Sequence, residues 1–240
     1  MPKIDKNAVV AVSKPAVGIE VSQEARALVG GFTSPLPDVA PDRVNTLYFY
    51  SGMSKHAGVM RDHIAGITDN APVLYTADDE GYYAAENLYL LRADLYFTEM
   101  DDQGNLIAVS REEVGKCFED FQAIVLVDLG DELIPARASF RRTRAAAARA
   151  MVRSLKKADP TGTNPLAWAA FKGRLRVHRK TRTNGGKGTY PVVDVDIFPT
   201  GEPEKKLIES AFSEPAFVTS LKQVRDAYES RLKFLESKLA

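Results

Sequence analysis

The chain has 240 residues, of which 45% are hydrophobic and 27% charged, as in an ordinary globular protein. It holds no apolar run of the roughly 18 residues that a membrane-spanning helix needs, and no apolar stretch behind a basic start that would indicate a secretory signal. One cysteine, Cys117, excludes an internal disulfide framework and fits a reducing compartment, so we expect a cytoplasmic protein without a membrane partner.

The 32 basic and 32 acidic residues cancel over the whole chain but are unevenly distributed. Residues 136–187 hold 15 of the lysines and arginines and a single acid, Asp159, so that 17 basic and 31 acidic residues lie elsewhere. This asymmetry favours an anionic partner for the basic segment. The alternative is chance clustering on a solvated face.

In chain order, the pattern predicts an arm, a β-rich domain and a helical end. Residues 1–44 are polar and marked by prolines, which is typical of an extended arm. After residue 200 the apolar periodicity becomes helical, so the expected division is 1–44, 45–200 and 201–240. From "NTLYFYSG" onward, short apolar-aromatic runs predict strands near 46–50, 72–76, 88–98, 105–109, 121–128, 133–140, 168–180 and 189–198.

Two hairpins and one internal helix give the clearest local patterns. "LLRADLYFTEMDDQGNLIAVS" and "AFKGRLRVHRKTRTNGGKGTYPVVDVDIF" each predict strand, turn and strand. Between them, "TRAAAARAMVRSLKKA" has high helix propensity. This order predicts an α+β, mostly β fold: an OB-fold-like five-stranded barrel with an inserted helix and a C-terminal helical extension. An open α+β sheet is the alternative.

Residues that usually carry catalysis or metal binding are scarce. The histidines His56, His63 and His178 lack partners at metal-ligand spacing, and Cys117 precedes the acidic "FEDF". "NGGKGT" lacks the glycine spacing and the following helix of a phosphate-binding P-loop. We therefore expect no enzyme activity, no metal and no cofactor.

The strand predicted at 168–180 separates charge from apolar side chains. Because alternate residues of a strand share a face, two sets of side chains are expected. The basic row is Arg174, Arg176, His178, Lys180 and Arg182, and the opposite set is Leu175, Val177, Arg179 and Thr181. Cations match phosphates and aromatic rings stack on unpaired bases, so the pattern favours binding of single-stranded nucleic acid. The candidate nucleic-acid-binding residues are Arg141, Arg142, Arg144, Trp168, Phe171, Arg174, Arg176, Lys180, Arg182 and Lys187.

Two alternatives to this interpretation stay open. Trp168 and Phe171 can equally pack in the core. The basic row can be the solvated face of a hairpin with no partner.

Near the C-terminus, apolar residues recur every three or four positions from Leu221 to Leu239. That stripe predicts either docking on the protein's own sheet, or self-association or a partner helix through residues 221–239.

The order of these segments resembles the OB-fold single-stranded-DNA-binding proteins encoded by bacteriophages. The similar stretches are "FQAIVLVDL", "PARASFRRTRAAAARAMVRSL", "WAAFKGRLRVHRKT" and "TYPVVDVDIF", within residues 45–200. The resemblance implies sequence-tolerant binding and protection of single strands in DNA replication or recombination, in the host cytoplasm. It also implies that Trp168, Phe171, Arg174 and Arg176 line the binding face. Many such proteins end in an acidic tail, whereas "YESRLKFLESKLA" predicts a mixed-charge helix.

Three functions are therefore considered. We expect a non-enzymatic single-stranded-DNA-binding protein. The second hypothesis is a structural or virion-associated protein whose basic region contacts nucleic acid or a partner subunit. The third, an enzyme acting on nucleic acid, lacks a recognisable carboxylate motif.

Overall fold

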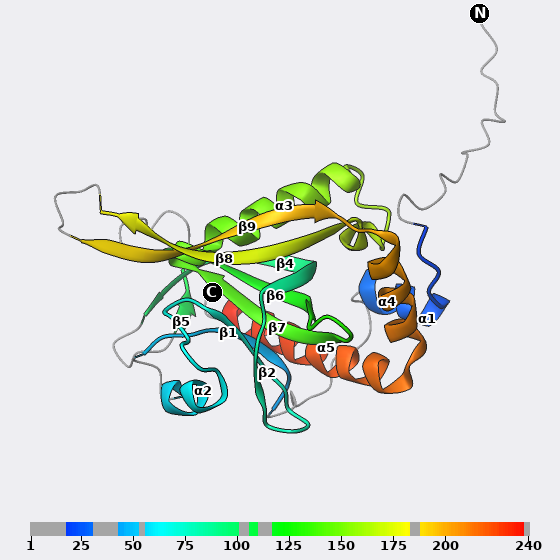
Figure 1. Cartoon of the computed structure of the whole chain (residues 1–240). Coiled ribbons are helices and arrows are strands. Elements are labelled where there is room, and N and C mark those ends of the chain that lie inside the picture. The colour runs from blue at the N-terminus through cyan, green and yellow to red at the C-terminus, as the bar shows by residue number, and fades with distance from the viewer. Residues whose placement is uncertain are drawn as a thin grey trace, which may run out of the picture.

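The computed structural model describes residues 18–30, 43–52, 56–100, 106–109, 117–182 and 188–237. Within these ranges, nine strands form one sheet that curls through 252° into a half-barrel, with helices packed on it in a mixed α+β fold (Figure 1). The five-stranded closed barrel predicted from the sequence is wrong. The sheet stays open because its edge strands, β3 (Tyr82–Ala84) and β9 (Thr189–Pro199), do not pair with each other.

The strand order is β3-β2-β1-β7-β6-β4-β8-β9, and β5 pairs with the far end of β4. Neighbours are antiparallel except β1 and β7, which run parallel with Thr46 opposite Arg137. The remaining strands are β1 (Thr46–Phe49), β2 (Pro72–Tyr75), β4 (Asn87–Met100), β5 (Leu106–Ala108), β6 (Phe118–Asp128), β7 (Leu133–Arg141) and β8 (Phe171–Thr181).

The helices lie on both sides of the sheet, and Figure 1 shows α3 and α5 on opposite sides of it. The alanine-rich segment predicted as a helix forms α3, as its high helix propensity requires. The helices are α1 (Gln23–Gly30), α2 (Ala57–His63), α3 (Ala145–Ala158), α4 (Glu202–Ser213) and α5 (Pro215–Glu236), with 3₁₀ turns η1 (Arg142–Arg144) and η2 (Ala167–Ala170).

Each side of the sheet carries its own hydrophobic core. Because alternate side chains of a strand point to opposite faces, Val125 and Val127 of β6 pack with α3, whereas Ile124 and Leu126 pack with α4 and α5. We call these faces the α3 side and the α5 side. A strand buried on both faces reads as a continuous apolar run, which is why "AIVLV" predicted it well.

Helix α1 differs from the extended arm predicted for residues 1–44. Ile19 and Ala25 are each 1% exposed, and Val29 joins them in the core shared with α4 and α5. The apolar spacing in "QEARALVG" gives a short amphipathic helix that the proline-rich surroundings masked in the sequence. Of the arm predicted for residues 1–44, the structure describes 18–30 and 43–44. The prediction for residues 1–17 and 31–42 lies outside the described residues.

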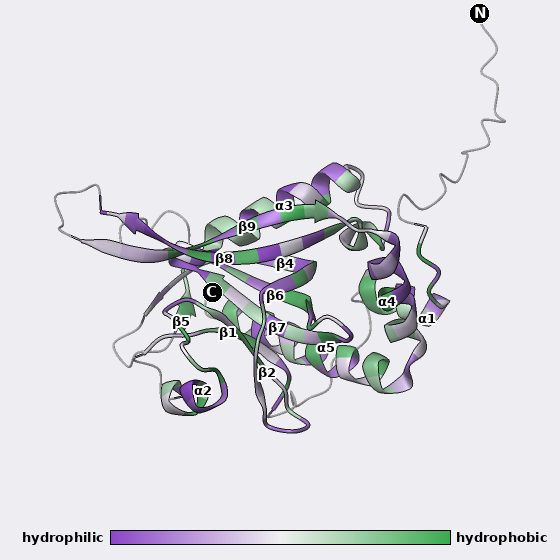
Figure 2. Cartoon of the chain, in the orientation of Figure 1, coloured by the Kyte–Doolittle hydropathy of each residue, from purple (hydrophilic) through white to green (hydrophobic). Residues whose placement is uncertain are grey.

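The apolar stripe of α5 docks on the protein's own sheet, which was one of the two alternatives. Leu221, Val224, Tyr228 and Leu232 are at most 8% exposed and pack on the α5 side, and Leu235 is also buried. Figure 2 shows hydrophobic and hydrophilic residues mixed along α4 and α5, as expected for helices with one buried face. Leu239 lies outside the described residues. Among the helices that are described, none is long and apolar enough to cross a membrane.

Candidate nucleic-acid interface

Strands β8 and β9 form the long hairpin that the sequence predicted, and it reaches beyond the rest of the sheet at the left of Figure 1. Leu175 is 2% exposed in the α3-side core, and Val177 packs against that core. Arg174 and Arg176 are exposed on the opposite face. The predicted division of this strand into an apolar and a basic face is therefore confirmed.

Acidic side chains from other segments face the basic row. Asp194 and Asp196 of β9 alternate with valines, so both lie on the same hairpin face as the cations, and Glu86 precedes β4. Exposed pairs of this kind contribute little and are screened by salt, so these cations are opposed but accessible. The pairs are Arg174–Glu86 at 3.2 Å, Arg176–Asp196, His178–Asp194 at 3.5 Å and Lys180–Asp194 at 3.9 Å.

The same compensation reaches further into the basic segment. Lys172 Nζ lies 2.9 Å from Asp128 Oδ2, and Arg149 pairs with Glu119 of β6. Much of the charge asymmetry along the sequence is thus cancelled inside the fold by acids from distant positions. The cations of the basic segment that form no such ion pair among the described residues are therefore the stronger candidates for binding an anionic partner.

Three of these cations gather where β7 turns into α3; we call Arg141, Arg142 and Arg144 the arginine corner. Arg142 adopts a left-handed backbone conformation with φ of 57°, which is unfavourable for a residue with a side chain of this size. Its guanidinium lies 4.2 Å from the ring centroid of Phe118, and that of Arg144 lies 5.0 Å from the ring centroid of Phe49. Cation–π contacts hold both side chains in place.

The arginine corner concentrates positive charge that is partly removed from water. Burial, together with Arg142, lowers the pKa of Arg141, and its Nη1 is buried without a hydrogen-bond partner. Burial, together with Arg141, lowers the pKa of Arg144 to about 10. Asp120 acts in the opposite direction on both, and its carboxylate already accepts a hydrogen bond from Ser139 Oγ at 2.7 Å.

The fold brings the arginine corner next to the basic hairpin. The Asn70 side-chain amide donates to the Pro191 carbonyl of β9 at 3.0 Å and to Thr143 Oγ1 of η1 at 3.4 Å. Asn70 itself has φ of 67°, a conformation that asparagine tolerates better than most residues. Two basic segments that are separate in the sequence thus lie side by side.

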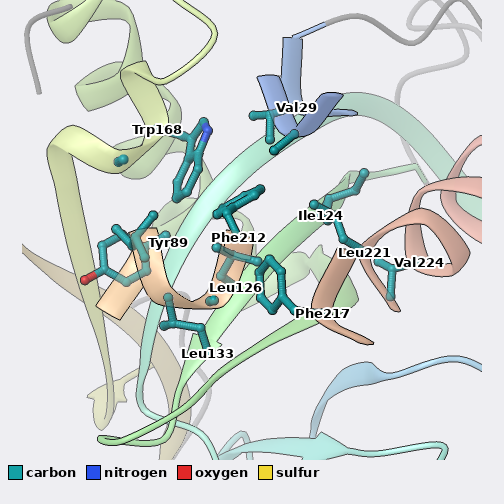
Figure 3. Close-up of a cluster of buried hydrophobic side chains, with 14 of the residues drawn as sticks. Val29, Tyr89, Ile124, Leu126, Leu133, Trp168, Phe212, Phe217, Leu221 and Val224 are labelled. Atoms are coloured by element: carbon teal, nitrogen blue, oxygen red, sulfur yellow. The ribbon is translucent and has the colours of Figure 1, made fainter. Parts of the chain in front are cut away.

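The predicted aromatic partners behave differently. Trp168 on η2 is 2% exposed, and its ring lies 6.2 Å from Tyr89 and 5.9 Å from Phe212, measured between centroids (Figure 3). Of its two alternatives, core packing is the one observed, so no ring face is open to a base. Phe171 is half-buried beside Met151 on the α3 side.

The remaining predicted residues belong to the hairpin tip. Arg182 is exposed, and its backbone N–H donates to the Gly188 carbonyl at 3.1 Å. Lys187 lies outside the described residues. Of these two tip cations, the structure therefore places only Arg182.

Two further arginines were missed by the sequence analysis. Arg137 lies two and four positions before Ser139 and Arg141 on β7, so all three face the α5 side. Burial lowers the pKa of Arg137 and of Arg231 on α5. In the described part of the chain neither has a carboxylate within 4.0 Å. The alternation in "RASFR" could have indicated Arg137, but nothing local indicates Arg231.

The arrangement can bind an extended polyanion, because unpaired guanidiniums and an exposed basic hairpin adjoin on one part of the surface. No family model, curated protein or solved structure matches this chain. The function must therefore be inferred from these side chains.

Proposed function

We propose that the protein binds single-stranded DNA without sequence preference and protects it during phage DNA replication or recombination. The observation that carries the proposal is the arginine corner: three guanidiniums lie within four residues, and those of Arg141 and Arg144 are partly buried and opposed by Asp120. Like charges held this close repel one another, and partly desolvated cations are costly without an anion. Phosphate oxygens relieve both costs through charge-assisted hydrogen bonds.

Backbone strain at the arginine corner supports the same proposal. A left-handed conformation costs an L-residue about 1–2 kcal/mol, and φ at Arg142 is 57°. Strain of this kind concentrates at functional sites, where a side chain must be held in one direction. Here it falls on Arg142, at the point where β7 ends.

The hairpin extends the cationic surface beyond the arginine corner. Its ion pairs with β9 acids are exposed, with Arg176 and Asp196 side chains 61% and 40% exposed, so a phosphate can replace an acid at low cost. Duplex DNA offers similar phosphates, so a preference for single strands also requires exposed rings. Trp168 does not supply one, whereas Tyr48 is 36% exposed.

Fluorescence anisotropy with labelled oligo-dT and with a duplex of equal length, each across a salt series, tests the proposal. We expect tighter binding to oligo-dT, with log K falling linearly with log[salt] at about −0.7 per phosphate contact. Arg142→Gln should reduce that slope by about 0.7, whereas Lys206→Gln, an exposed lysine on α4, removes the same charge and should leave the slope unchanged.

Two outcomes would overturn the proposal. Absence of oligo-dT binding, or binding that is indifferent to salt, would remove its electrostatic basis. Equal affinity for the duplex would favour the structural or virion-associated alternative, in which the basic surface contacts nucleic acid without reading its strandedness.

A further inference from the structure

A row of aromatic rings crosses the first three strands of the sheet. Tyr48 of β1, Tyr75 of β2 and Tyr82 of β3, with His56 and His63 at the two ends of α2, form what we call the aromatic strip. Ring centroids are 6.5 Å apart for Tyr48 and Tyr75, and 5.3 Å apart for Tyr75 and Tyr82. His56 stacks on Tyr48 at 6.4 Å, and His63 meets Tyr82 edge-on at 5.6 Å.

The strand register places these rings on the same side of the sheet. Tyr75 is directly opposite Tyr82 in the β2–β3 pair, and the neighbours Leu47 and Leu74 point into the α3-side core. Since alternate residues face opposite sides, the tyrosines face the other way. The strip therefore lies on the α5 side of the sheet, the side to which the basic row of the hairpin also points.

The rings are neither fully packed nor hydrogen-bonded through their hydroxyl groups. Tyr48 is 36% exposed, and Tyr75 and Tyr82 are half-buried. None of the three hydroxyls has a hydrogen-bond partner among the described residues. Burial raises the pKa of Tyr82, and Tyr48 and Tyr75 add to this, which reflects how close the three phenols lie. A buried tyrosine usually finds a partner, so these rings resemble a contact surface more than a core.

A cation that has no acid partner among the described residues adjoins the strip. Arg137 is opposite Thr46 in the parallel β1–β7 pair, and Tyr48 is near enough to act on its pKa. Arg231 of α5 lies close to Arg137, which adds to burial in lowering the pKa of Arg231. Across the sheet, the guanidinium of Arg137 is thus followed by the rings of Tyr48 and Tyr75. This order matches a nucleic acid strand, in which a guanidinium can hold a phosphate and the rings can stack on the bases beside it.

We propose that the aromatic strip is a stacking surface for unpaired nucleobases, with Arg137 holding a phosphate beside Tyr48. The proposal rests on the single-stranded-DNA-binding function. It places the contacts with bases on strands β1–β3, whereas the sequence analysis had placed them on β8. Stacking tolerates any base because every base has a π face, which fits binding without sequence preference.

Strand β7 connects the arginine corner to the neighbourhood of the strip. Arg137 and Arg141 are on the same face of β7, four residues and therefore about 13 Å apart at roughly 3.3 Å per residue. Because α5 packs against β7 on this face, a single strand that reaches both places has its phosphates held at the arginine corner and its bases stacked on the strip, without running along β7 between them. Duplex DNA keeps its bases enclosed, so it can make only the phosphate contacts at the arginine corner.

Tyr48→Leu tests the stacking surface, because leucine keeps apolar bulk but has no ring. Tyr48→Phe keeps the ring and loses only a hydroxyl without a partner. Phe198→Ala, which removes a 45% exposed ring on β9 outside the strip, is the positional control. Affinities are measured by anisotropy for oligo-dT and for an abasic oligonucleotide of equal length, which has the same phosphates and no bases. Thermal melting of each variant checks that it is folded.

We expect the wild-type protein to prefer oligo-dT over the abasic strand, and Tyr48→Leu to lower oligo-dT affinity by about 5- to 150-fold, the equivalent of one lost stacking contact. Its affinity for the abasic strand should not change, and both controls should keep the wild-type preference. If the wild-type protein binds oligo-dT and the abasic strand equally, or if Tyr48→Leu keeps the preference, the stacking surface is wrong while DNA binding stands. If the wild-type protein binds neither strand, the proposed function itself fails.

Discussion

Replacing Asp194 and Asp196 with asparagine should strengthen binding to single-stranded DNA, because these acids neutralise the outer face of the β8–β9 hairpin. Arg176 pairs with Asp196, and Lys180 Nζ lies 3.9 Å from Asp194 Oδ2. Asparagine is close in shape to aspartate and removes only the charge. Both cations then lose their competing partner without moving on the strand.

The geometry sets the size of the effect. Two released cations, each making one phosphate contact, steepen the salt slope by about 1.4 at about 0.7 per contact. Exposed ion pairs contribute about 0.2–1 kcal/mol each, so removing two acids should raise affinity by about 2- to 30-fold. Since the side chains of Asp194 and Asp196 are 52% and 40% exposed, the free energy of unfolding should fall by no more than about 2 kcal/mol.

Anisotropy across a salt series, paired with urea unfolding, measures both quantities. The matched control is Asp131→Asn with Glu214→Gln, two exposed acids away from the hairpin, which changes net charge equally. A control that raises affinity as much as the hairpin variant would attribute the gain to net charge. Unchanged affinity and slope in the hairpin variant would show that the basic row is only a solvated ion-pair surface.

Two further outcomes follow from the site geometry. Arg142→Gly should leave the free energy of unfolding equal or higher, because relief of about 1–2 kcal/mol of strain at φ 57° exceeds the loss of a cation–π contact of about 0.5–1 kcal/mol. The same variant should bind oligo-dT more weakly. A clear loss of stability in denaturant titration would contradict the strain argument. Trp168 fluorescence should stay constant as oligo-dT is added, because the ring is 2% exposed, and strong quenching at saturation would contradict its burial.

The sequence predicted elements wherever local pattern determines them. The apolar run of β6, the alternation in β8 and β9 and the alanines of α3 each carry their own signal, and all of them form. Strand β3 has only three residues and exists because β2 pairs with it, so pattern alone could not find it. The number of strands in the sheet depends on long-range pairs such as Thr46 with Arg137, which no local window records.

In the candidate site too, local pattern predicted some features, and tertiary contacts determined the rest. Alternation correctly assigned Arg174 and Arg176 to one face, because period two is a property of the strand itself. Their acids come from β9 and from Glu86, so the balance of charge is a product of tertiary pairing. Trp168 shows the reverse case: a basic neighbourhood in sequence suggested a binding ring, yet η2 turns it into the α5-side core.

Two edges of the open half-barrel, those of β3 and β9, each carry a safeguard against aggregation. Unpaired edge strands are templates for joining another chain's sheet. Strand β3 is too short to offer much of a template, and β9 contains Pro191 and Pro199, which lack the N–H that such pairing needs. Asn70 also occupies the outward carbonyl of Pro191. Copies of the protein at high concentration can therefore lie close together without fusing through these two edges into fibrils, and any order among them has to come from side chains.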